Sequence, residues 1–411
     1  MEALTAAAGQ PHPAGSIASL PSVDALIARY VGEGLVSGIV VAWQQGGAPV
    51  RFACAGEPAF HAGRPVDADS LFRIFSMTKP ITGIATMMLI EDGRLALDQP
   101  LHSILPEFAD ARVMIDGDPA RTRPAARPIT IRHLLTHTAG LGYHNAGDGI
   151  ASLYIRNGLT PGTRDRIRGP GELAAPGSLA EMGSRLARLP LVTDPGTRFE
   201  YSIAIDVLGL VVETVSGMPF ETFLQQRLFD PLGMADTAFV VPTERLGRLT
   251  ALVERRGEAW KFVDDPAHSV YARPALPSGG GGLVSSARDY ARFAALLVNE
   301  GELDGKRLLK PETVRLARSN LLPGGVDHIE LPLGYTWPGI GFGAAMSVQV
   351  ADGEAPAGVF GWPGAAGTGC WIDPARRFFL VFMTQYWPPE INVTMRPEII
   401  AAAYRDLSGQ G

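Results

Sequence analysis

The sequence predicts an α+β protein in which strands from both ends of the chain form one antiparallel sheet. Apolar, β-rich runs lie at the two ends: 38–44, 50–55, 359–362, 368–372 and 378–385. The turn sequences Gln45-Gly46-Gly47-Ala48 and Asp373-Pro374-Ala375-Arg376 predict hairpins, and hairpins pair their strands antiparallel. Such a sheet needs helices to cover it, and the middle of the chain supplies mainly helical patterns.

The other predicted elements are helices: 23–31, 76–92, 131–136, 201–216, 219–229, 287–299 and 397–407. We expect an α/β domain made from 20–73 and 275–408, with a mainly helical domain, 74–274, inserted between its two parts. The stretch 147–176 is rich in Gly, Arg and Pro and has no clear period. It predicts a long loop that either covers a functional site or is disordered.

The composition is that of a globular protein with an ample core, since 46% of the 411 residues are hydrophobic and 19% are charged. A net charge of −6 without a basic stripe argues against nucleic acid and anionic membranes as partners. No apolar run is long enough to span a bilayer, and residues 1–21 lack the features of a secretory signal. We therefore expect a cytoplasmic protein. Cys54 and Cys370 lie in apolar runs and predict buried thiols.

The strongest chemical signal is Ser76-Met77-Thr78-Lys79, which ends a strand-like run and begins a nearly all-apolar helix. At the start of a helix, Ser76 and Lys79 lie one turn apart on one face. The positive end of the helix dipole favours an alkoxide on the serine and disfavours an ammonium on the lysine. The pair therefore predicts a nucleophile beside its base. The alternative is a serine that only caps the helix and a lysine that is solvated.

Three further patterns bear on the site. Tyr201 follows a turn and begins a helix, so it is a candidate proton shuttle or an aromatic residue packed on the core. Pro363 cannot donate to a sheet ladder, and Gly364 allows close backbone approach, so Trp362-Pro363-Gly364 predicts a ligand cleft or an ordinary sheet edge. The glycines 279–282 lack the following Gly-Lys-Ser/Thr of a phosphate loop and predict a tight turn against other backbone.

His133 and His137 have the spacing of metal ligands, but no glutamate lies between them and no third ligand is evident, so we expect structural histidines and no metal. A Gly-x-Ser-x-Gly pentapeptide, the mark of the common esterase fold, is absent from the sequence. A nucleophilic Ser76 therefore implies a different catalytic architecture.

Taken together, three of these patterns resemble the motifs of family VIII carboxylesterases, serine esterases related to class C β-lactamases and penicillin-binding proteins. They are Ser76-Met77-Thr78-Lys79, Tyr201-Ser202 after Pro-Gly-Thr-Arg, and Trp362-Pro363-Gly364. The stretches 133–141 and 279–289 also resemble the group, and the resemblance spans about 20–407. It implies two domains, with the site in the cleft between them, and no cofactor. It also implies that Ser76 accepts the acyl group, that Lys79 and Tyr201 share the work of general base, and that the backbone N–H groups of Ser76 and Ala365 form the oxyanion hole.

Two departures from the lactamase pattern bear on the substrate. Trp362 stands where the lactamases have the lysine of Lys-Thr-Gly, and Ile203 stands where they have the asparagine of Tyr-x-Asn. Losing an ammonium and an amide favours neutral, apolar acyl esters over substrates that carry a carboxylate, with Trp362, Gly364 and Ile203 lining the pocket. We therefore expect a serine carboxylesterase that acts on small-molecule esters. The alternatives are a β-lactamase or D-alanyl-D-alanine peptidase, an acyltransferase with the same nucleophile, and a non-catalytic sensor. The sequence leaves the oligomeric state open.

Overall fold

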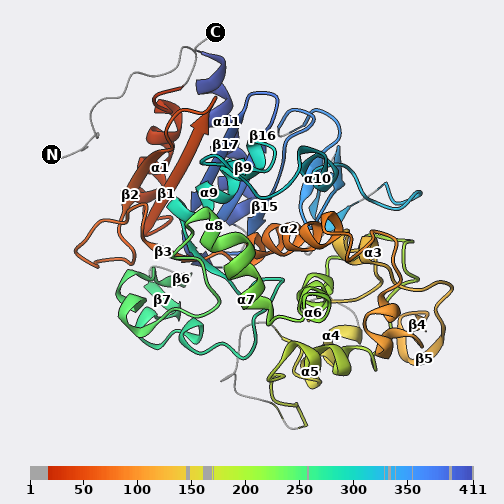
Figure 1. Ribbon diagram of the computed structural model, residues 1–411. Helices are drawn as coiled ribbons and strands as arrows, with labels where there is room; N and C mark the ends of the chain where they lie inside the picture. Colours follow the sequence, from red (N-terminus) through yellow and green to blue (C-terminus); the bar gives the residue numbers. More distant parts are fainter. Residues whose placement is uncertain are drawn as a thin grey trace.

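The α+β architecture is confirmed by the structure, a computed structural model that describes residues 17–409 apart from 145–148, 161–168, 170, 257–258, 328, 332–334, 338, 354 and 388–390. Its main sheet is antiparallel throughout and joins strands from both ends of the chain (Figure 1). In spatial order the strands are β13 (Ile340–Phe342), β14 (Ser347–Gln349), β15 (Phe360–Gly364), β16 (Thr368–Asp373), β17 (Phe378–Met383), β1 (Gly38–Gln45) and β2 (Arg51–Gly56).

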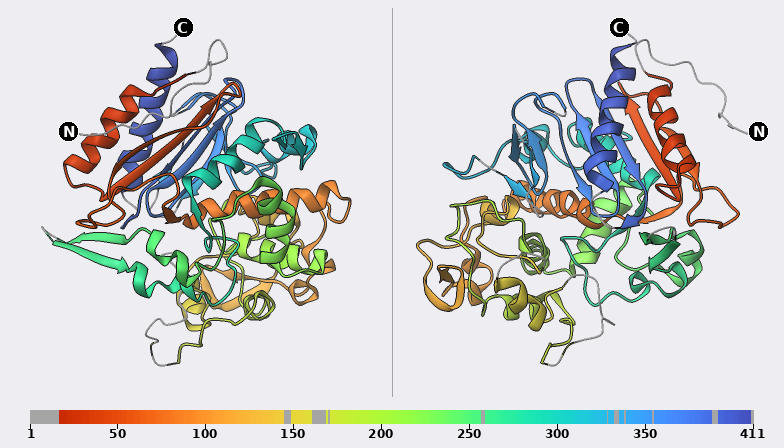
Figure 2. Two further views of the ribbon diagram at one scale, coloured as in Figure 1. Left: turned by 60° about the vertical axis from the view of Figure 1, so that its left-hand side comes forward. Right: turned by 180° about the vertical axis from the view of Figure 1, so that it is seen from behind.

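The sheet separates two hydrophobic cores, because successive side chains of a strand point to opposite faces. In β1, Val40 packs in one core and Val41 in the other. One face carries α1 (Pro21–Gly32) and α11 (Ile391–Ser408), which lie side by side (Figure 2). The opposite face carries α9 (Ala287–Val298), which packs against β1, β16 and β17.

Helix α2 (Thr78–Glu91) lies between the sheet and the helical part of the chain (Figure 1). Its residues from Thr78 to Leu89 are all buried, as the apolar sequence predicts. The other helices are α3 (Ile131–Leu135), α4 (Gly149–Arg156), α5 (Leu179–Leu186), α6 (Ala204–Ser216), α7 (Phe220–Leu224), α8 (Asp230–Leu232) and α10 (Pro311–Ala317). Of these, α6 and α10 pack directly against α2.

Small sheets complete the fold. Strand β3 (Leu71–Arg73) pairs antiparallel with β8 (Val284–Ser286). Three strands form a second sheet, in which β18 (Tyr386–Trp387) runs parallel to β6 (Leu252–Arg256), and β6 pairs with β7 (Ala259–Asp264). The remaining pairs are β4 (Arg112–Ile115) with β5 (Asp118–Pro124), β9 (Glu302–Leu303) with β10 (Lys306–Arg307), and β11 (Glu330–Leu331) with β12 (Tyr335–Thr336).

Three local predictions are wrong. The stretch 147–176 contains α4 and the start of the link to α5 rather than one irregular loop, although its residues 147–148, 161–168 and 170 lie outside the described part. Helix α11 begins at Ile391 and continues through Pro397, which we had expected to start it. Cys54 is exposed: it lies on the edge strand β2, whose neighbours Ala53 and Ala55 face the core with α1, so Cys54 points to the other side. Cys370 is buried, as predicted.

Among the described residues, no single helix is long and apolar enough to cross a membrane; a sharply bent pair, Ala204–Ser216 with Phe220–Leu232, meets the criteria of length and composition only when taken together.

Candidate active site

Ser76 lies on a tight turn between β3 and α2. The preceding residue, Phe75, has φ of 44°, in the left-handed region that residues other than glycine seldom adopt. A 3-10 turn, Phe75–Met77, follows, and α2 begins only at Thr78, two residues later than the sequence suggested. The Ile74 N–H, which donates to Leu283 O at 3.1 Å, anchors the turn to the segment before β8. Backbone strain held in place by such contacts is common at functional sites.

Lys79 is fully buried beside this serine. Its Nζ lies 3.1 Å from Ser76 Oγ and donates a shorter hydrogen bond, 2.6 Å, to the carbonyl oxygen of Gly280. Because the lysine lies in the first turn of α2, the predicted placement of both side chains on one face is confirmed. The interpretation of Lys79 as a solvated surface residue is wrong.

Tyr201 approaches the same serine from the segment that precedes α6. Its hydroxyl donates to Ser76 Oγ at 2.7 Å, although the two residues are 125 positions apart. The ring is held between other rings, with centroids 4.7 Å from His137 and 5.8 Å from Trp362, and Lys79 Nζ lies 4.6 Å from its centre. The tyrosine, the lysine and the serine therefore form one cluster from two separate segments, since Ser76 and Lys79 lie three residues apart.

His137 supports this cluster as a neutral ring. It is completely buried, and burial, aided by the nearby charge of Lys79, holds its pKa well below its usual value of 6.5. Its Nδ1 accepts from the backbone N–H of Ser202 at 3.2 Å, which fixes the segment that carries Tyr201.

His133 has a different role, which is to cap a helix: its Nδ1 accepts from Thr130 N–H in a capping box at the start of α3. No group of three potential metal ligands occurs in the part of the chain that the structure describes.

The end of β15 lies against the turn that carries Ser76. A Cβ added to Gly364 would be 2.3 Å from Ile74 O, so only glycine allows this approach. Pairing between β14 and β15 ends at Gly361, whereas β16 pairs with β15 as far as Gly364. Pro363 therefore needs no partner on the β14 side, as its missing N–H predicts. Ala365, which follows directly, is half-buried.

Trp362 belongs to an aromatic cluster behind Tyr201. It is 3% exposed, and its ring centroid lies 5.1 Å from that of Phe342 and 5.5 Å from that of Trp337. Ile203 is also 3% exposed and packs in the large core at the start of α6. The roles of Trp362, Gly364 and Ile203 as pocket walls, and of Ala365 as an oxyanion donor, stay predictions.

The sequence did not assign to the site three residues that support Lys79 in the structure: Gly280, whose carbonyl accepts from the amine, and Asp206 and Ser278, which hydrogen bond to one another beside it. The prediction that glycines 279–282 form a turn against other backbone is confirmed, because a Cβ on Gly279 would be 2.8 Å from Ile205 O. That the turn contacts the lysine amine could not be read from the pattern. Asp206, an acidic residue inside an apolar helix, was a visible signal.

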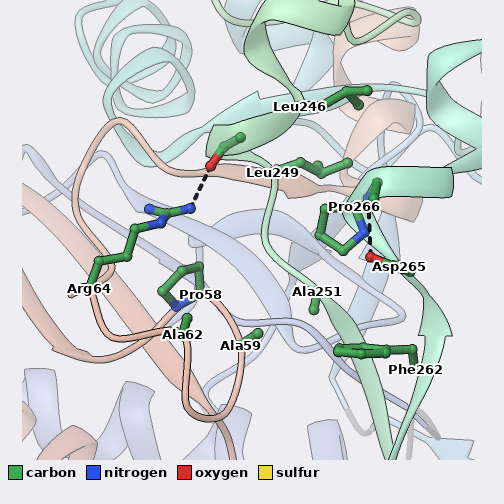
Figure 3. Close-up of a pocket in the computed structure, with 12 residues that line it drawn as sticks. Pro58, Ala59, Ala62, Arg64, Leu246, Leu249, Ala251, Phe262, Asp265 and Pro266 are labelled. Carbon is green, nitrogen blue, oxygen red and sulfur yellow. Dashed lines mark hydrogen bonds between the residues drawn. The ribbon is translucent and has the colours of Figure 1, made fainter.

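A pocket of about 450 Å³ is lined by a different set of residues (Figure 3). The loop after β2, the 3-10 turn Thr243–Arg248 and the end of β7 surround it, with Pro58, Leu249 and Phe262 among the lining residues. Arg64 closes one side by donating to Gly247 O at 2.6 Å. None of Ser76, Lys79 and Tyr201 lines this pocket.

Comparisons with known proteins agree with this architecture. The family model described as Beta-lactamase matches residues 23–404. An uncharacterized protein of Mycobacterium tuberculosis is 36% identical over 383 residues, which cover 90% of this chain and 91% of that protein. Esterase EstB of Burkholderia gladioli is 34% identical over 345 residues, which cover 79% of each chain.

Among solved structures, EstCE1, described as a hydrolase with promiscuous acyltransferase activity, superposes with a TM-score of 0.76 at 27% identity. The match covers 93% of this chain and 98% of that one. The chain therefore belongs to the β-lactamase family, as the match to the family model, the relatives and the shared fold together show, and it is a serine hydrolase similar to the family VIII-type esterases.

Proposed function

We propose that this protein is a carboxylesterase that hydrolyses small, apolar acyl esters through a covalent acyl-enzyme on Ser76. The observation that carries the proposal is the position of Ser76 Oγ, 3.1 Å from Lys79 Nζ and 2.7 Å from the Tyr201 hydroxyl. Both distances allow direct proton transfer to and from the serine. A serine that merely capped a helix would need neither neighbour.

In the first half of the reaction, Ser76 Oγ attacks the ester carbonyl carbon and its proton passes to the Lys79–Tyr201 pair. The backbone N–H groups of Ser76 and Ala365 stabilise the tetrahedral oxyanion. The carbon–oxygen bond to the alcohol then breaks, and the pair returns the proton to the leaving alkoxide. In the second half, water attacks the acyl-enzyme, gives up a proton to the same pair and releases the acid, while Ser76 Oγ recovers its proton.

The surroundings support neutral substrates. The third motif carries the apolar Trp362 instead of a lysine, so it offers no cation for a substrate carboxylate. Trp337, Phe342 and Tyr201 surround Trp362 with further aromatic rings. An apolar acyl group gains by transfer to such surroundings, whereas a charged one loses its hydration.

The test is intact-mass analysis after brief incubation with a short-chain aryl ester and, separately, with a fluorophosphonate. We expect one adduct on Ser76, with phenol release continuing after the adduct saturates. Ser76→Ala should abolish turnover and labelling while the protein stays folded, and Ser319→Ala, which removes only an exposed hydroxyl bound to Leu316 O, should retain both. Full turnover by the Ser76→Ala variant would refute the proposal.

A second candidate is transfer of the acyl group to an alcohol, which the description of EstCE1 favours. The two functions share the acyl-enzyme and differ only in what attacks it. Adding a small primary alcohol to the aryl ester assay distinguishes them: transfer yields the new ester in place of the acid. The same assay with a cephalosporin tests for β-lactam hydrolysis as a side activity.

A further inference from the structure

The amine of Lys79 is held by a glycine-rich turn rather than by a carboxylate. Its hydrogen bond to Gly280 O, 2.6 Å, is shorter than its contact with Ser76 Oγ, 3.1 Å. No ion pair to Lys79 occurs among the residues that the structure describes. The position of the amine next to the serine therefore depends on the position of one peptide carbonyl.

Asp206, in the first turn of α6, fixes that carbonyl. Its Oδ1 accepts from Gly280 N–H at 3.1 Å and from the Ser278 hydroxyl at 2.5 Å. On the other side, the Thr82 hydroxyl of α2 donates to Gly279 O at 2.8 Å. The turn is thus tied to both helices, and Gly280 donates to Asp206 while its carbonyl accepts from Lys79.

Gly279 and Gly280 lie so close to α6 that a side chain at either position would clash. A Cβ on Gly280 would lie 2.3 Å from Asp206 Oδ2, and one on Gly279 would lie 2.8 Å from Ile205 O. Real Cβ atoms do not make such contacts. A side chain on Gly279 would push the turn away from the backbone of α6, and one on Gly280 would displace either the turn or the Asp206 carboxylate, so both changes would disturb the carbonyl that Lys79 contacts.

A buried carboxylate such as that of Asp206 lowers the stability of the fold, so its presence here suggests a role other than stabilisation. Asp206 is 3% exposed, and its Oδ2 has no hydrogen-bond partner among the described residues. Burial raises the pKa of this carboxyl, while the Ser278 hydrogen bond and the charge of Lys79 lower it. A leucine would occupy the same core position without that cost, so stability alone does not account for an acid there.

We propose that Asp206 is a positioning residue. It holds the Gly280 carbonyl in place, and that carbonyl in turn keeps the Lys79 amine within hydrogen-bond distance of Ser76 Oγ. Asp206 forms no bond with substrate and exchanges no proton in the reaction. This role rests on the proposed function, because it concerns how readily Ser76 acts as a nucleophile. Errors of about 1 Å in the placement of a reacting group lower rates about 100-fold.

The chain offers a matched control in Asp289. It occupies the same helical position in α9, is 4% exposed, and likewise accepts from a backbone N–H and a hydroxyl, those of Asp236 and Thr237. It does not contact Lys79. Loss of either carboxylate removes buried hydrogen bonds to a neighbouring loop, but only loss of Asp206 should displace the lysine.

The experiment measures the rate at which a fluorophosphonate labels Ser76, by intact mass, alongside kcat and KM for an aryl ester. We expect Asp206→Ala and the near-isosteric Asp206→Leu to slow labelling and lower kcat by about 30- to 100-fold, with KM within about twofold of the wild type. Asp206→Asn keeps an acceptor for Gly280 N–H and should recover the rate to within about fivefold of the wild type. Asp289→Ala should label at the wild-type rate.

Labelling at the wild-type rate by either Asp206→Ala or Asp206→Leu would overturn the positioning role and leave the proposed function intact. Equal slowing by Asp289→Ala would also overturn it, since the effect would then follow from loss of any buried aspartate. A wild-type protein that forms no adduct on Ser76 would overturn the proposed function, and the role of Asp206 with it. Asp206→Leu keeps the test decisive if the alanine variant does not fold.

Discussion

At the scale of the residue, the proposed chemistry depends on two groups that meet at one oxygen. Tyr201→Phe removes the hydroxyl that lies 2.7 Å from Ser76 Oγ and keeps the ring that packs against His137 and Trp362. Positioned acids and bases contribute about 100- to 10,000-fold to rates, so we expect kcat to fall within that range. The melting temperature should change little. Steady-state kinetics with an aryl ester and a thermal melt measure both quantities.

Lys79→Met is the companion variant, because it replaces the amine with an apolar side chain of similar length. Burst kinetics with both variants separate the two halves of the reaction: a slow burst indicates loss of the group needed for acylation, and a fast burst followed by slow turnover indicates loss of the group needed for deacylation. A Tyr201→Phe variant with wild-type kcat would exclude the hydroxyl from the mechanism.

The sequence predicted the cluster of Ser76, Lys79 and Tyr201 but not its support. Lys79 lies one helical turn from Ser76, so its placement follows from local geometry, and Tyr201 was proposed from its motif. Asp206 and Gly280 are 74 residues apart, and Gly280 is 201 residues from Lys79. Contacts of that kind arise from the packing of α6 against α2, which no local pattern describes.

At the scale of the element, the site requires β15 to end directly against the Ser76 turn. Gly364→Ala would place a Cβ 2.3 Å from Ile74 O and 2.1 Å from Thr368 Oγ1. We expect a loss of about 1–3 kcal/mol of stability from overpacking. The rate should also fall about 100-fold, because the predicted oxyanion donor at Ala365 moves. Gly32→Ala, where nothing lies within 4 Å of the added Cβ, is the control. Urea denaturation measures the stability and steady-state kinetics measure kcat/KM. If Gly364→Ala left both values unchanged, the close contact between β15 and the Ser76 turn would not be needed for folding or activity.

The strand that leads to Ser76 is anchored by Arg73, which is completely buried. Its guanidinium contacts the Asp264 carboxylate at the end of β7 and donates to Thr250 O at 2.6 Å. Arg73→Ala leaves the mostly buried Asp264 without its cationic partner, so we expect a loss of about 3–5 kcal/mol in the free energy of unfolding. Arg29→Ala, which breaks the exposed ion pair with Glu398, should cost less than about 1 kcal/mol. Equal losses in urea denaturation would contradict the assignment of Arg73 as an anchor.

The elements themselves were predictable where one signal dominated. Two apolar, β-rich runs and the short turn between them predicted β1 and β2, and the helical spacing of apolar residues predicted α1. The start of α11 was not predictable, because Pro397 is a typical helix-starting residue and here lies inside the helix. Helix α4 was missed because its eight residues lie within a Gly- and Pro-rich stretch.

At the scale of the whole molecule, strands from the two ends of the chain form one sheet. β1 pairs with β17 along six residues, and α1 packs against α11 on the outer face of the sheet. The helical part is joined to this sheet through α2, which directly follows the 3-10 turn that carries Ser76. The sequence predicted this arrangement because its hairpins lie at both ends. The domain boundaries that we drew stay a prediction.

Buried histidines give the whole fold a predictable sensitivity to acid. Burial lowers the pKa of His133 to about 4, and it holds that of His137 well below 6.5. An unfolded histidine titrates near 6.5, so below that pH the unfolded chain binds more protons than the folded one. The free energy of unfolding therefore falls as the pH decreases from about 6.5 towards 4. Asp289, with its pKa raised to about 6, and Asp206 act in the opposite direction, because their folded forms bind the extra proton.

A difference measurement isolates one histidine from these opposing groups. His133→Gln retains a polar side chain near Thr130 N–H and removes the titration, whereas Asp289, Asp206 and His137 remain in both proteins. Between about pH 7 and about pH 5 the wild type should lose about 2 kcal/mol more stability than His133→Gln, since each unit of displaced titration contributes about 1.4 kcal/mol. His102→Gln, which changes an exposed side chain, should behave as the wild type does. Urea denaturation of the three proteins at both pH values supplies the comparison. Equal acid sensitivity in His133→Gln and the wild type would mean that His133 accepts its proton in the folded protein without cost, and the buried, neutral state inferred for it would then be wrong.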